Sequence, residues 1–155
     1  MVLRAAIAAV HYLALALGLG GVFARGLRLR QLQRSPGDAE AVRALLRADG
    51  AWGLAALLWV GTGLTRVFAG LEKASEFYLR NGFFYTKMGL FLLVVALELF
   101  PMITFVRWRK TLARGGAPTT GAPLARLTRI NDLELAIAVV IPFVAALMAR
   151  GAWLF

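Results

Sequence analysis

FFYTKMGLFLLVVALELFPMITF, the stretch from Phe83 to Phe105, decides the fold class because it is long enough and apolar enough to cross a lipid bilayer. It nevertheless carries Lys87 and Glu98, and ionisable side chains inside a membrane span usually face protein or water instead of lipid. The two residues are three helical turns apart, so they lie on one face of a helix with roughly 16 Å between their levels. We therefore expect that face to point into a bundle of helices.

Three further apolar runs accompany this one, and each approaches the length of a membrane span. The composition agrees, because 60% of the residues are hydrophobic and only 17% are charged. The first run lacks the small-residue cleavage site of a signal peptide, so we expect it to be retained. The sequence thus predicts one all-α integral membrane domain, residues 1–155, folded as a four-helix antiparallel bundle. Its expected spans are 3–24, 50–69, 82–105 and 132–153.

The basic residues lie mainly in two of the connections, 25–49 and 106–130. Positively charged connections stay in the cytoplasm, so both termini are predicted to lie outside a bacterial inner membrane. Trp52 and Trp108 would then mark the inner membrane interface. Asn131 and Asp132 would cap the last span, and Ser35 would cap a short interfacial helix.

Composition and missing motifs exclude several classes of function. The net charge is +10, but the basic residues follow membrane topology, so we expect the lipid bilayer and no nucleic acid as partner. The chain contains no cysteine, which excludes disulfides and thiolate catalysis. The sequence also lacks a P-loop, a GxSxG motif and an HExxH motif. A homo-oligomer and a small-molecule partner stay open.

His11 is the main candidate for chemistry in the first span. It begins a stripe of residues at intervals of seven that continues through Gly18 to Arg25, with Gly21 on the same side. Small residues let another helix or a flat ligand approach the backbone closely. An imidazole there could carry a proton or bind a metal centre, or it could simply hydrogen-bond to a neighbouring helix.

The predicted topology places several more polar side chains at the depth of His11 in the outer half of the membrane. They are Arg66 and Lys87 together with the phenols Tyr12 and Tyr85. Cations that share a layer repel one another unless an anion joins them or some lose their protons. The alternative for Arg66 and Lys87 is that both reach outward to lipid headgroups. In the inner half we expect Glu98 to form an ion pair with Arg25.

Three segments resemble a known family: HYLALALGLGGVFAR, FFYTKMGLFLLVV and RINDLELAIAVVIPFVA. Together they resemble the HemJ-like four-helix membrane protoporphyrinogen oxidases, and more distantly the copper-resistance D-type proteins. The whole chain is also similar to a bacterial family of four-span membrane proteins of unknown function. The HemJ resemblance implies that His11 ligates haem iron and that Lys87 is required for activity. Gly21 with Phe23, and Asn131 with Asp132, match further positions of the pattern.

Two functions from different classes follow. The first is a redox protein that binds haem b or a porphyrin, with His11 as the metal ligand and Lys87 as the catalytic residue. Arg66, Tyr85, Gly18 and Gly21 would complete its cofactor site. The alternative is a non-catalytic accessory or structural subunit whose buried polar residues only stabilise helix packing. Copper transport is a weaker third reading, because one histidine, four methionines and no cysteine make a poor set of soft ligands.

Overall fold

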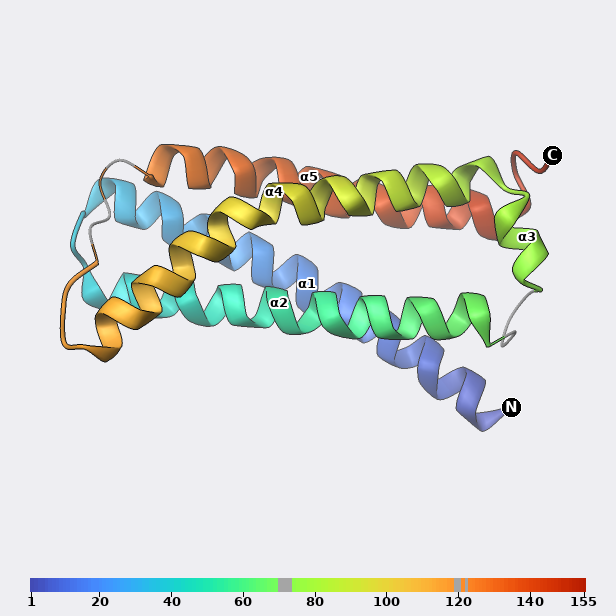
Figure 1. Ribbon diagram of the computed structural model, residues 1–155, viewed down its shortest axis with the longest axis horizontal. Coiled ribbons are helices and arrows are strands. Elements are labelled where there is room, and N and C mark those ends of the chain that lie inside the picture. The colour runs from blue at the N-terminus through green and yellow to red at the C-terminus, as the bar shows by residue number, and fades with distance from the viewer. Residues whose placement is uncertain (70–73, 119–120, 122) are drawn as a thin grey trace.

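The computed structural model describes residues 1–69, 74–118, 121 and 123–155, and it confirms the all-α fold class (Figure 1). Four helices are long and apolar enough to cross a membrane. They are α1 (Val2–Arg34), α2 (Ala39–Phe68), α4 (Gly82–Ala113) and α5 (Leu124–Ala149), and a short α3 (Ser75–Leu79) precedes α4. The proline at 101 in α4 and the one at 142 in α5 lie inside these helices without ending them, as expected for membrane helices.

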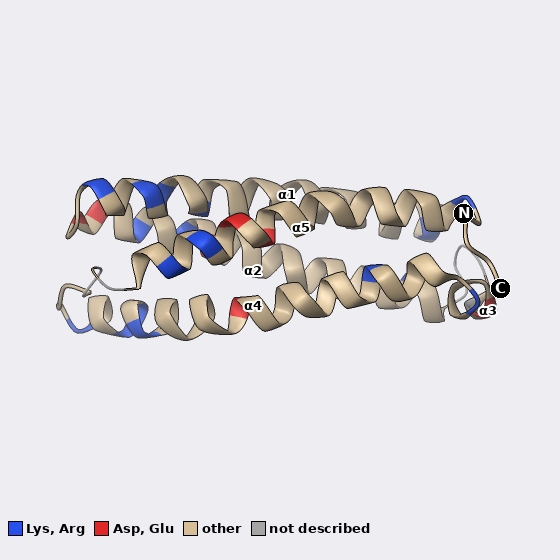
Figure 2. Cartoon of the chain, turned by 90° about the horizontal axis from the view of Figure 1, so that it is seen from above, with Lys and Arg blue, Asp and Glu red and all other residues tan. Residues whose placement is uncertain are grey.

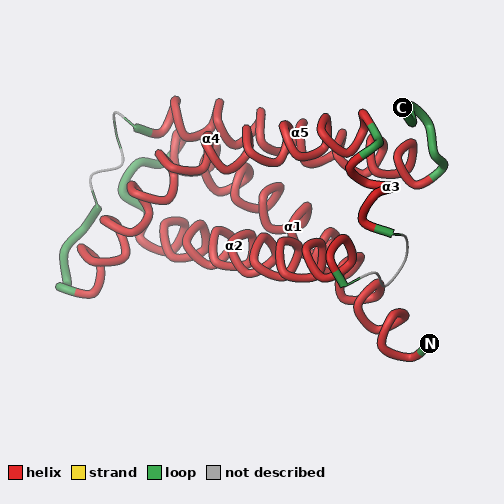
Figure 3. The backbone as a smooth tube through the Cα atoms, turned by 45° about the vertical axis from the view of Figure 1, so that its right-hand side comes forward, coloured by secondary structure: helices red, strands yellow, loops and turns green. Residues whose placement is uncertain are grey.

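The four long helices form an antiparallel bundle (Figure 1). Helix α1 packs along α2 and against α5, and α4 packs against α5. Both chain termini and α3 lie at one end of the bundle, and the two connections α1–α2 and α4–α5 lie at the other (Figures 1 and 3). Lysine and arginine residues gather at the end of the bundle with these two connections (Figure 2).

The turn between α1 and α2 differs from the expected capping. Ser35 does not begin a separate helix; it ends α1, its backbone N–H bonding to the carbonyl of Gln31 at 3.0 Å. Asp38 is the N-cap, and its side chain accepts hydrogen bonds from the backbone N–H groups of Glu40 and Ala41. Asp38 therefore takes the capping role expected of Ser35, and it determines where α2 starts. Helix α2 continues from this cap into the second span without a break.

A hydrophobic core fills the basic end of the bundle, beyond the limits of the predicted spans. Leu29 and Leu45, both fully buried, contribute to it from α1 and α2. Trp108 joins this core, and Trp52 lies in the next cluster along the bundle. The two residues are 5% and 7% exposed, so both side chains pack inside the bundle, and their place at the inner interface stays a prediction.

The opposite end is closed by the C-terminal residues, which fold back on the start of α4. The backbone N–H of Gly82 bonds to the carbonyl of Trp153, and the N–H of Phe155 bonds to the carbonyl of Arg80. Gly82 has to be glycine here, since an added Cβ would lie 2.2 Å from the Trp153 ring. The C-terminus therefore fixes the position of α4 relative to α5.

Candidate functional site

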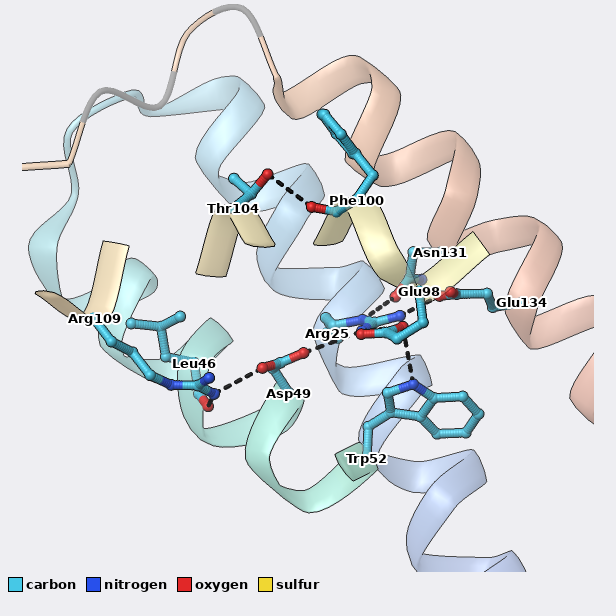
Figure 4. Close-up of polar contacts among 10 residues, drawn as sticks. All are labelled: Arg25, Leu46, Asp49, Trp52, Glu98, Phe100, Thr104, Arg109, Asn131 and Glu134. Atoms are coloured by element: carbon cyan, nitrogen blue, oxygen red, sulfur yellow. Dashed lines mark hydrogen bonds and ion pairs between the residues drawn. The ribbon is translucent and has the colours of Figure 1, made fainter. Parts of the chain in front are cut away.

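Arg25 is the centre of the most connected polar group in the described chain (Figure 4). Its side chain is fully buried. It donates to Asp49 of α2 at 3.1 Å and to both carboxylate oxygens of Glu98 of α4 at 3.0 Å. On α5 it donates to the side-chain oxygen of Asn131 at 2.8 Å and to the carboxylate of Glu134. One guanidinium thus connects all four long helices.

Two glycines of α1 allow the neighbouring helices to come this close to Arg25. A Cβ on Gly21 would lie 2.9 Å from the backbone nitrogen of Trp52, so α2 approaches the backbone of α1 directly. A Cβ on Gly26 would lie 2.6 Å from the side-chain amide nitrogen of Asn131, so Gly26 makes room for the Asn131 side chain of α5. Small residues at helix crossings are the usual device for close packing in membranes.

Aromatic side chains surround the guanidinium. The indole N–H of Trp52 donates to Glu98 at 3.1 Å. The guanidinium carbon of Arg25 lies 5.9 Å from the ring centroid of Trp52 and 5.9 Å from that of Phe105. These distances are within the range of cation–π attraction, and the rings also shield the charges from water and lipid.

Asp49 connects the buried arginine to the basic end of the bundle. Its second carboxylate oxygen accepts a hydrogen bond from Arg109 of α4 at 2.7 Å, and Arg109 also donates to the carbonyl of Leu46 (Figure 4). The side chain of Arg109 is 42% exposed, whereas that of Asp49 is 10% exposed. These contacts therefore form a network that runs from the core to the surface. We call it the Arg25 network, and its members are Arg25, Asp49, Glu98, Asn131, Glu134 and Arg109.

Two atoms of the Arg25 network are buried without a hydrogen-bond partner among the described residues. One is Oε1 of Glu134 and the other is the amide nitrogen of Asn131. Glu134 and Asn131 are 0% and 1% exposed, so water does not reach them from the surface. Unpaired polar atoms are rare in buried sites and need a physical explanation.

The ion pair expected between Glu98 and Arg25 is confirmed, but most of the network was not anticipated. Asn131 and Asp132 do not cap the fourth span, because α5 already begins at Leu124. Instead Asn131 bonds to Arg25, and Asp132 pairs with Arg30 at 2.6 Å. The sequence contains one indication of this network: Asn131 and Glu134 are spaced so that both lie on one face of a helix.

The structure brings part of the predicted outer layer together. His11 has its Nδ1 2.8 Å from the hydroxyl of Thr62, and its ring centroid is 5.9 Å from that of Trp59. The Thr62 hydroxyl is also 2.6 Å from the carbonyl of Leu58 and donates its hydrogen there. Thr62 is therefore the acceptor toward His11, so the Nδ1 atom of His11 carries the proton and Nε2 carries the lone pair.

Arg66 contacts Tyr12, the residue after His11, whereas Tyr85 and Lys87 lie near the start of α4. The guanidinium of Arg66 is 5.8 Å from the ring of Tyr12, and that ring is 6.4 Å from the imidazole. The ammonium of Lys87 lies 5.6 Å from the ring centroid of Phe84 on the same helix. Tyr85 donates its hydroxyl to the carbonyl of Leu79 and is 52% exposed.

The two glycines named for a flat cofactor lie in a helix interface. A Cβ on Gly18 would lie 3.3 Å from Ala55 and 3.4 Å from the Trp52 ring, and Gly21 meets the backbone of α2. Helix α2 therefore occupies the space beside both glycines. Among the described residues no group of three or more His, Asp or Glu side chains is arranged to hold a metal ion.

Comparison with known proteins identifies one family. A family model described as "Predicted membrane protein (DUF2214)" matches residues 3–152. No curated protein and no solved structure matches the chain. The similarity to HemJ-like oxidases stays a prediction.

Proposed function

We propose, from the premise that this chain belongs to the DUF2214 family of predicted membrane proteins, that it is a non-catalytic helical subunit of the membrane. In this role the Arg25 network holds the four long helices in one arrangement. The observation that carries the proposal is that Arg25 hydrogen-bonds to side chains on α2, α4 and α5 at once.

The physical argument rests on what drives helix association in lipid. Apolar side chains are as well solvated by lipid tails as by each other, so polar contacts and close packing select the helix partners. A buried ion pair adds little net stability compared with apolar packing, but it disfavours arrangements that leave its charges unpaired. Gly21 supplies the close packing and Arg25 the polar contacts, and both lie within one stretch of α1.

The decisive experiment replaces Arg25 with methionine, which keeps the volume and removes the charge. Glu98 and Glu134 would then lose the cation they share, while Asp49 would keep only Arg109, and breaking such a buried group destabilises a protein by about 3–5 kcal/mol. We expect the midpoint of thermal unfolding in mild detergent to fall by on the order of 10 °C. Size-exclusion chromatography of the same sample reports loss of the folded bundle.

Arg30→Met is the matched control, because Arg30 lies on the same helix and also pairs with an acid. Both side chains of the Arg30–Asp132 pair are 45% exposed, and an exposed pair contributes about 1 kcal/mol or less. His11→Gln and Lys87→Met should leave the unfolding midpoint close to that of the wild type. An Arg25→Met protein as stable as the Arg30→Met protein would refute the structural role.

A haem or porphyrin site in the outer half is the second candidate, and one observation favours it. Donation from Nδ1 of His11 to Thr62 leaves Nε2 with a lone pair, which is how metal-ligating histidines are usually held. Arg66 and Lys87 are suitable cationic partners for propionate groups. Gly18 and Gly21, however, leave no space for a flat macrocycle, because α2 packs against them. Haem, when bound, would supply one-electron chemistry.

The visible absorption spectrum tests this second candidate directly. Protein purified in mild detergent from haem-supplemented cells should show a Soret band that is lost in His11→Ala. A folded wild-type protein without that band would remove the haem proposal and leave the structural role untouched.

A further inference from the structure

We infer that Glu98 and Glu134 share one bound proton, which makes the Arg25 network a proton-binding site. This goes beyond the structural role proposed above, since a scaffold needs only paired charges.

The charges of the Arg25 network do not balance without a proton. Helix α1 contributes the cation Arg25, and α4 contributes the cation Arg109. Three acids face them: Asp49 from α2, Glu98 from α4 and Glu134 from α5. An uncompensated charge in a buried site is strongly unfavourable, and one proton on an acid makes the network neutral.

The proton belongs to the pair Glu98 and Glu134, because Asp49 is already bonded to both arginines. The carboxyl groups of Glu98 and Glu134 both bond to the guanidinium of Arg25, so two buried acids share one cation (Figure 4). Two like charges held on one buried cation repel each other unless one of the acids carries a proton.

The unpaired oxygen of Glu134 supports the same assignment. Glu134 is fully buried, and its Oε1 has no donor among the described residues. An ionised carboxylate with one oxygen left without a donor loses part of its solvation, whereas a neutral carboxyl group loses much less. The neighbouring Glu98 keeps 22% of its side chain exposed, so the described residues do not fully enclose the pair. Release of the proton would leave α4 and α5 facing each other with like charges.

The test is infrared difference spectroscopy of the full-length protein in detergent at neutral pH. We expect a carbonyl band of a protonated carboxylic acid, and this band should shift when the sample is transferred to D₂O. Glu134→Gln and Glu98→Gln, which each replace an acid by a neutral amide of the same shape, should each lose the band and remain folded.

Asp132→Asn is the matched control, because Asp132 lies on the same helix as Glu134 but pairs with Arg30, outside the Arg25 network. It should keep the band. A wild-type protein without the band, or a band that survives in both glutamine variants, would overturn the inference. Either result is independent of the Arg25→Met experiment, so the proton site and the structural role can fail separately.

Discussion

At the scale of single residues, two neighbouring glycines of α1 have different roles. A Cβ on Gly21 would lie 2.9 Å from the backbone nitrogen of Trp52 and 3.2 Å from the carbonyl of Ala48. Gly20, the residue before it, has no atom within 4 Å of its Cβ position and is exposed. The absence of a side chain is therefore required at one position and incidental at the other.

We predict that Gly21→Ala lowers stability whereas Gly20→Ala does not. The added methyl group at Gly21 would push α2 away from α1, and overpacking of this kind destabilises a protein by about 1–3 kcal/mol. At Gly20 the change only improves helix propensity, a gain of up to about 1 kcal/mol. Thermal unfolding of both variants in the same detergent measures the difference. Equal midpoints would mean that the close approach of α2 does not matter.

At the scale of helices, α1 is the element whose contacts position the other helices. Its residues Ala14 to Leu32 include every buried position of the helix, and it contacts both α2 and α5. The residues before Ala14 are largely exposed, which suits a segment in contact with lipid. The packed part of α1 is thus its second half, where Gly21, Arg25 and Gly26 lie within two turns. This is also the half that continues past the expected end of the first span.

At the scale of the whole molecule, charge is distributed unevenly between the two ends of the bundle. Lysine and arginine side chains gather at the end with the α1–α2 and α4–α5 connections (Figure 2). We propose that this end lies in the cytoplasm, since the positive-inside rule orients multi-pass proteins in that way. Both termini and α3 would then lie on the outer side of the membrane.

The absence of native cysteine makes this orientation directly testable. We expect Ala74→Cys, at the end with the termini, to react with a membrane-impermeant maleimide in intact cells. Pro36→Cys, in the α1–α2 turn, should react only after the membrane is permeabilised. Both positions are exposed, so accessibility within the protein does not separate them. The reverse labelling pattern would invert the topology.

The sequence by itself determined the membrane class, the four helices and the pairing of Glu98 with Arg25. The membrane class and the four helices follow from the length of the apolar runs, and the ion pair follows from the high free energy of an unpaired charge in lipid. Both properties can be read from short stretches of sequence. Only the tertiary structure decided that Asp49 and Glu134 join the same arginine, because residues on α2 and α5 meet α1 through packing that no local pattern encodes. It likewise decided that Gly18 and Gly21 pack against α2, since a small residue in a helix is equally suited to a ligand or to another helix.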